Sequence, residues 1–162
     1  MNKQILEAKQ SVVAEIVSKA KDSASVTIAH YRGLTVTQLE QLRRALRKED
    51  AELCIYKNSL VERAVKELGI EGLDEYLTGP NAIIFSKDVS NGPKIASKFA
   101  KKFGDTLTIK GGVCEGKAYD KAGMIEIGKL PGRDGLISMF LSCLQAPVRS
   151  FACAVQAVAD AK

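Results

Sequence analysis

The sequence is poor in the residues from which enzymes assemble active sites. It contains one histidine, His30, and no P-loop, G-x-S-x-G or H-E-x-x-H motif. His30 falls within a predicted strand, which favours a structural role for its side chain over that of a catalytic base. We therefore predict a protein that is not an enzyme, with no catalytic residue and no cofactor.

The four cysteines form no C-x-x-C pair, and one histidine is too few for a typical zinc site. We predict no metal ligand and no disulfide. The cysteines are expected to be free, buried thiols in a reducing cytosol. They are Cys54, Cys114, Cys143 and Cys153.

Long apolar runs are also missing. Residues 1–21 lack the continuous apolar core of a signal peptide. Near the C-terminus, Gln145, Pro147 and Arg149 interrupt the most apolar window, and no run of roughly 18 apolar residues remains. We expect a cytoplasmic protein with no membrane partner, and keep a C-terminal membrane anchor as the alternative.

The charge points to an anionic partner. The 162 residues carry 24 basic and 19 acidic side chains, a net charge of +5. The alternative is a soluble basic protein with no such partner. Aromatic residues make up 6% of the chain and form no RNP-like motif. If the anionic partner is RNA, contacts to its backbone are therefore expected rather than stacking on its bases.

Apolar periodicity predicts alternating helices and strands. A T-x-x-E capping box at Thr37 and Glu40 marks the second helix, and Gly69 ends the third. We expect strands at 25–31, 53–56, 82–85 and 106–113, and helices at 3–21, 37–46, 59–68, 93–103 and 120–127. This order predicts an α+β fold: a ferredoxin-like (split βαβ) sandwich with an extra N-terminal helix, a hinge and a C-terminal helical tail. A doubly wound sheet is the alternative.

Polar residues follow the predicted strands at positions that suit anion binding. If a right-handed helical crossover joins the first two strands, they run parallel and end at the same edge of the sheet. Residues 32–33 and 57–58 would then meet there, and residues 79–80 would join them if the third strand is antiparallel. These residues can bind phosphate and sugar oxygens; the alternative is that they are turn residues with solvated charges. Residues 110–112 could bring backbone close to a phosphate.

Two further groups of basic residues line helix faces. We interpret both as solvated surfaces, with contact to nucleic acid as the alternative. They are Lys94, Lys98, Lys101 and Lys102, and Arg43, Arg44 and Arg47.

The last 26 residues, 137–162, contain three charged side chains and an unbroken a/d seam of large apolar residues. The Pro- and Gly-rich segment before them predicts a hinge at 131–136, between a domain at 1–130 and a tail helix at 137–162. The alternatives are an ordinary surface loop and a tail folded back onto the sheet. The seam consists of Ile137, Leu141, Leu144, Val148, Phe151, Val155 and Val158.

An ordered set of short segments resembles the bacterial large-subunit ribosomal protein ten family, whose members form the base of the ribosomal stalk. The segments span nearly the whole chain. They are residues 31–35, 42–43, 57–60, 79–80, 99–101, 109–112 and 130–131.

The resemblance implies an N-terminal domain that binds large-subunit ribosomal RNA beside ribosomal protein eleven. It also implies a tail helix whose seam carries dimers of stalk protein seven/twelve, and these dimers recruit translational GTPases. The protein would then act in the cytoplasm on the large ribosomal subunit. The RNA-binding residues carried over are Arg32, Gly33, Lys57, Asn58, Gly79 and Pro80, with Lys110 added.

The tail departs from the family pattern in two ways. Gly132 and Gly135 replace polar residues, and because glycine weakens a helix, we expect a later helix start or a looser hinge. Pro147 predicts a kink or a division of the helix. The seam would then consist of two halves, 137–144 and 148–158, each binding one dimer.

Three other functions are compatible with the sequence. An RNA-binding regulator could act on a messenger RNA outside the ribosome, and a coiled-coil adaptor could use the tail without any RNA. An enzyme of phosphate chemistry is the least favoured, because the chain offers no catalytic groups.

Overall fold

The computed structural model describes residues 3–70 and 72–160, and the chain divides into two units, Met1–Leu130 and Pro131–Lys162. The first unit contains one sheet and five of the described α-helices. The second contains a single helix, α6 (Arg133–Asp160).

The sheet has the strand order β2-β3-β1-β4-β5, and every neighbouring pair is antiparallel. Since β1 and β2 are both antiparallel to β3, which lies between them, they run parallel to each other. The order confirms the α+β prediction and excludes the doubly wound alternative. The strands are β1 (Ser25–His30), β2 (Ala51–Cys54), β3 (Asn81–Ser86), β4 (Thr108–Cys114) and β5 (Lys117–Asp120).

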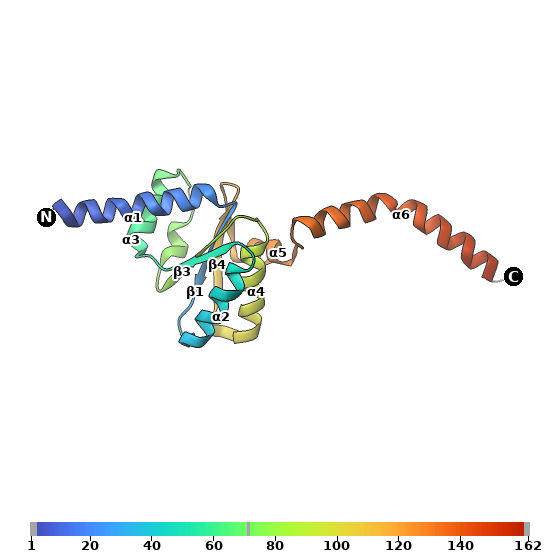
Figure 1. Cartoon of the computed structure of the whole chain (residues 1–162), viewed down its shortest axis with the longest axis horizontal. Helices are drawn as coiled ribbons and strands as arrows, with labels where there is room; N and C mark the ends of the chain where they lie inside the picture. The colour runs from blue at the N-terminus through green and yellow to red at the C-terminus, as the bar shows by residue number, and fades with distance from the viewer. Residues whose placement is uncertain (1–2, 71, 161–162) are drawn as a thin grey trace. The chain divides into compact units, whose positions relative to one another are not determined.

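Helices cover both faces of the sheet (Figure 1). All residues of β3 are buried, and they alternate between the two cores: Ile84 packs with α2 and α4, whereas Ile83 packs with α1 and α3. Met124 of α5 completes the first core. The helices are α1 (Lys3–Asp22), α2 (Val36–Arg47), α3 (Asn58–Glu67), α4 (Asn91–Phe103) and α5 (Lys121–Lys129), with short 3-10 turns η1 (Asp74–Leu77) and η2 (Gly104–Thr106).

The capping box of α2 lies two residues before the predicted one. The Thr35 hydroxyl accepts from the Gln38 amide at 3.4 Å, and the Gln38 side chain accepts from the Thr35 amide at 3.0 Å. Thr37 instead shares a hydrogen bond with the Thr35 hydroxyl, so the prediction of Thr37 and Glu40 was wrong. The prediction for Gly69 is confirmed: it follows the C-cap of α3 with a φ of +68°.

Strand β5 was not predicted. It pairs with β4 through a two-residue turn, Glu115 and Gly116, whose φ values are +51° and +80°. Positive φ at both positions is typical of a type I′ hairpin turn, which usually contains Asn or Asp before Gly. Because this chain has Glu115 in that position, the sequence did not indicate the turn.

The thiol predictions were half right. All four cysteines are free, Cys114 is buried and Cys54 is half-buried. Burial raises the pKa of the Cys114 thiol to about 11. The prediction that Cys143 and Cys153 are buried was wrong, because both lie exposed on α6.

Helix α6 begins earlier than predicted and continues through its proline. Its first residue is Arg133 rather than Ile137, so only Pro131 and Gly132 of the predicted hinge lie outside the helix. A Cβ at Gly135 would lie 2.7 Å from the Pro131 Cβ, so the glycine lets the proline pack across the first turn. The helix continues through Pro147 and is not divided there, and its ribbon is bent in Figure 1.

Gly111 and Gly112 serve packing rather than phosphate binding. Both are buried in β4, beside an irregularity in the β1–β4 register. A Cβ at Gly112 would lie 2.4 Å from the Val26 carbonyl oxygen, and one at Gly111 would lie 2.9 Å from the Tyr119 carbonyl oxygen. The prediction that this backbone approaches a phosphate is therefore wrong.

Replacing Gly112 by alanine should lower the free energy of unfolding by about 2–3 kcal/mol, because the new methyl group overlaps backbone that cannot move independently. Urea unfolding followed by circular dichroism measures this change. Ala118→Ser, on the exposed edge strand β5, is the control and should change stability by less than about 0.5 kcal/mol. An unaltered midpoint for Gly112→Ala would contradict the close packing of β4 against β1.

Candidate functional site

Four strand ends meet at one edge of the sheet. His30, the last residue of β1, is paired with Asn81 at the start of β3 and with Thr108 at the start of β4. Strand β2 is parallel to β1 and ends beside β3 at the same edge. The seven residues predicted from the sequence flank these strand ends, and we call them the cationic edge: Arg32, Gly33, Lys57, Asn58, Gly79, Pro80 and Lys110.

Three side chains hold the 78–80 segment at the centre of this edge. The Asn58 amide donates to the Gly79 carbonyl oxygen at 2.9 Å, and the Lys110 ammonium group donates to the carbonyl oxygen of Thr78. His30 Nδ1 lies 2.8 Å from the Pro80 carbonyl oxygen. A carbonyl can only accept, so Nδ1 carries the hydrogen in this contact. The segment is thus fixed from α3, β4 and β1.

Gly79 leaves the middle of the cationic edge uncovered. Its φ of +82° is in the left-handed region that glycine adopts most readily. A Cβ there would face His30 Cε1 and Lys110 Nζ, each at 3.9 Å. Because Gly79 has no side chain, a ligand can approach its backbone beside the Lys110 ammonium group.

The cationic edge carries positive charge without ion-pair partners among the described residues. Arg32 and Lys57 are exposed, and Lys110 is half-buried. The ion pairs found in the part of the chain that the structure describes join Lys19 to Glu15 and Glu52, and Arg44 to Glu40. An ammonium group has three donors, so Lys110 retains donors beyond the one that binds Thr78. This arrangement can bind a polyanion through its oxygens.

Sequence reasoning missed two contributors to this edge. His30 was expected to be structural, which fits its bond to Pro80, but its contact with the glycine segment was not foreseen. Thr78 contributes through its backbone carbonyl, for which no residue type gives a signal.

Outside this edge, the basic face of α4 is partly engaged with its own helix. The Lys102 ammonium group lies 5.9 Å from the Phe99 ring centroid and 5.6 Å from that of Phe103. Such cation–π contacts hold the side chain along the aromatic surface. No cluster of three or more potential metal ligands occurs among the residues that the structure describes.

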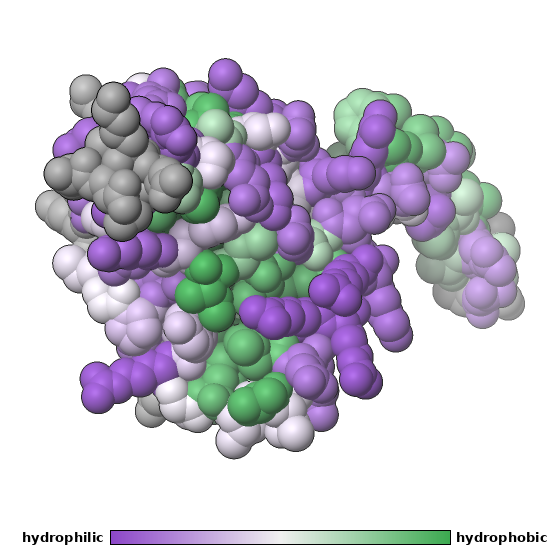
Figure 2. All heavy atoms as spheres, turned by 60° about the vertical axis from the view of Figure 1, so that its left-hand side comes forward, coloured by the Kyte–Doolittle hydropathy of each residue, from purple (hydrophilic) through white to green (hydrophobic). Residues whose placement is uncertain are grey.

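The second candidate surface is the apolar face of α6. None of its described residues is buried, and Val148 and Phe151 are 74% and 72% exposed. Hydrophobic atoms lie along this helix in Figure 2. Leu136 and Phe140 widen the predicted seam, since Phe140 follows Ile137 by three residues and precedes Leu144 by four. Within the described residues, α6 is also the one helix long and apolar enough to cross a membrane.

Comparison with known proteins gives two family matches. Residues 4–101 match the model described as Ribosomal protein L10, and residues 130–162 match that described as Ribosomal protein uL10 C-terminal region. The two matches coincide with the two surfaces: the first includes six of the seven residues of the cationic edge, and the second includes the whole apolar seam.

Curated relatives are similar over almost the full chain. Large ribosomal subunit protein uL10 of Shouchella clausii is 48% identical over 159 residues, which cover 98% of this chain and 95% of the relative. The protein of the same name from Bacillus licheniformis is 48% identical over 158 residues, covering 97% and 95%. That from Staphylococcus carnosus is 46% identical over 159 residues, covering 98% and 95%.

Proposed function

The chain belongs to the ribosomal protein L10 family, and we propose that it forms the base of the ribosomal stalk. It is a structural protein of the large ribosomal subunit in the bacterial cytoplasm, not an enzyme. In this proposal the first unit binds large-subunit ribosomal RNA beside ribosomal protein eleven. Helix α6 carries dimers of stalk protein seven/twelve, and these dimers recruit translational GTPases.

The observation that carries the RNA-binding part is the convergence of four chain segments at the cationic edge. Arg32, Lys57 and Lys110 come from three different segments and share no ion pair with a described acidic residue. Phosphate groups are the ligands that such a set of cations neutralises best. The exposed backbone at Gly79 and the side-chain amide of Asn58 can bind sugar and phosphate oxygens of the RNA.

The dimer-binding part is supported by the exposed seam of α6. At about 1.5 Å per residue, this 28-residue helix is roughly 42 Å long, which suffices for two partners in a row. Burying its seven seam side chains at about 1.5–3 kcal/mol each would contribute about 10–20 kcal/mol before the costs of association. Pro147 lies between Leu144 and Val148 and separates the two halves.

A protein partner accounts for α6 better than a bilayer does. The length and composition of α6 satisfy the requirement for a membrane span. Arg149 and Gln145, however, lie inside the apolar segment, and a charged side chain within a bilayer is costly. The match of residues 130–162 to a ribosomal family region also favours a protein partner.

Lys57→Gln and Arg32→Gln should each weaken binding to cognate large-subunit ribosomal RNA by about tenfold at roughly 0.1 M salt, because each removes one phosphate contact. Each should also reduce the slope of log affinity against log salt by about one unit. Filter binding of transcribed RNA across a salt series measures both quantities. Lys66→Gln makes the same charge change in the last turn of α3, at the opposite end of that helix from Asn58, and is the control. Unchanged slopes for both site variants would contradict RNA binding at the cationic edge.

Leu141→Asp and Phe151→Asp should each remove one stalk dimer, and the double variant should remove both, because each introduces a carboxylate into one half of an apolar interface. Native mass measurement of complexes purified after co-expression gives the number of dimers directly. Ser142→Asp and Gln156→Asp, each one position after a seam residue and outside the seam, are the controls and should retain both dimers. A wild-type complex with one dimer or three would show that the two-halves account is wrong.

A further inference from the structure

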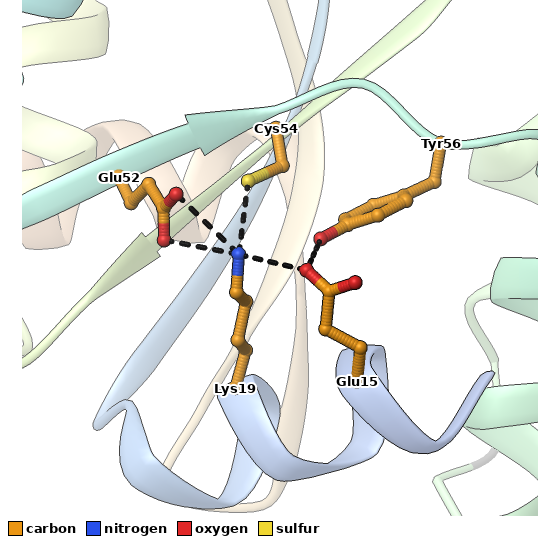
Figure 3. A network of polar contacts seen from close by, with 5 residues as sticks. All are labelled: Glu15, Lys19, Glu52, Cys54 and Tyr56. Carbon is orange, nitrogen blue, oxygen red and sulfur yellow. Dashed lines mark hydrogen bonds and ion pairs between the residues drawn. The ribbon is translucent and has the colours of Figure 1, made fainter. Parts of the chain in front are cut away.

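Five polar side chains connect helix α1 to strand β2 and its extension (Figure 3). The Lys19 ammonium group lies 3.0 Å from Glu15 Oε1, 3.2 Å from Glu52 Oε2 and 3.7 Å from Cys54 Sγ. The Tyr56 hydroxyl donates to Glu15 Oε1 at 3.0 Å. Residues 15 and 19 are one helical turn apart, so both face the strand from the same side of α1.

This network lies directly before the cationic edge. Glu52, Cys54 and Tyr56 occupy alternate positions and face α1, whereas Ala51 and Leu53 face the opposite core. Tyr56 is followed by Lys57 and Asn58, which are the N-cap and first residue of α3. The Tyr56–Glu15 hydrogen bond therefore fixes the backbone immediately before two proposed RNA-binding residues.

The start of α3 has little local support of its own. Lys57 has an extended backbone and makes no side-chain capping hydrogen bond. The first turn is closed by the Leu60 amide, which donates to the Lys57 carbonyl at 2.9 Å. The side-chain amide of Asn58, the first residue of α3, donates to the Gly79 carbonyl. The segment 56–58 is thus held at one end by Glu15 and at the other by Gly79.

Four groups of this network have pKa values shifted away from neutral pH. Hydrogen bonds from Lys19 and then Tyr56 lower the pKa of Glu15, and the hydrogen bond to Glu15 raises the pKa of Lys19. Burial raises the pKa of Tyr56 and of Cys54, so both remain neutral near pH 7. The network therefore does not act as a pH switch near neutral pH, and Cys54 is not a reactive thiol.

We propose that Glu15 and Tyr56 are positioning residues for RNA binding: through their hydrogen bond, α1 sets the place of Asn58 against Gly79 and aims Lys57 at the RNA. This inference rests on the proposed RNA-binding function. Neither side chain needs to touch the RNA. Their effect passes along the backbone from Tyr56 to Asn58.

Tyr56→Phe is the primary test, because it removes one hydroxyl group and leaves the charge and the ring. It should weaken binding to transcribed cognate large-subunit ribosomal RNA by about three- to tenfold. Glu15→Ala should weaken binding as well, although it adds one unit of positive net charge. Glu40→Ala is the matched control: it makes the same charge change in an exposed α2 pair, 3.6 Å from Arg44. It should leave affinity unchanged or slightly higher.

A double-mutant cycle separates positioning from a general loss of structure. Because Tyr56 acts partly through Asn58 and partly through Lys57, the affinity loss caused by Tyr56→Phe should be smaller in the Asn58→Ala background than in the wild-type chain. Amide NMR spectra of Tyr56→Phe should also show shifted or broadened signals for Lys57, Asn58 and Gly79, with the signals of β4 retained. The Glu40→Ala spectrum should show no change at these three residues.

Unaltered affinity for Tyr56→Phe, or fully additive losses in the cycle, would overturn the positioning role. The outcome is distinguishable from failure of the proposed function. If the wild-type chain does not bind the RNA, or if Lys57→Gln and Arg32→Gln both have no effect, RNA binding at the cationic edge itself is wrong. If Lys57→Gln weakens binding and Tyr56→Phe does not, only the positioning role is wrong.

Discussion

The structure depends on the placement of β3 between two strands that run parallel to each other. Because β1 and β2 are both antiparallel to β3, their ends and the beginning of β3 occupy one edge of the sheet. Residues far apart in sequence, such as Arg32, Lys57 and Gly79, therefore come together without any long loop. Strand β4 adds Lys110 to the same edge by pairing with β1. A different strand order would separate these residues and abolish the cationic edge.

This constraint explains why the edge was predictable and its detail was not. Parallel strands are usually joined by a helical crossover, so the strand–helix–strand pattern suggested, as a condition, that β1 and β2 run parallel, and the sheet shows that they do. The hydrogen bonds of Asn58 to Gly79 and of His30 to Pro80 depend on exact distances between loops, which no periodicity encodes. Gly111 and Gly112 were misread for a related reason. A glycine that permits ligand approach and a glycine that permits strand packing look the same in a sequence.

The two units differ in whether they bury their apolar residues. The first unit buries a core on each face of its sheet, and Leu46 and Ile84 there are fully buried. Helix α6 cannot cover its own seam, since the side chains of one helix point outward, and its described residues include no buried one. The sequence pattern revealed the seam but not its full width. Phe140 and Leu136 belong to the apolar face, yet they lie outside a strict a/d register. The helix start was misplaced because Gly135 suggested weakness, whereas its missing side chain makes room for Pro131.

The central claim is that one chain holds two separable docking surfaces, an RNA-binding edge and a dimer-binding helix. Native mass measurement of the full-length chain and of residues 1–130, each mixed with cognate large-subunit ribosomal RNA and the stalk protein, tests it most directly. The account predicts that the full-length chain carries both RNA and two dimers, and that the shortened chain retains RNA and carries none. A shortened chain that still binds dimers, or that folds but no longer binds RNA, would contradict it.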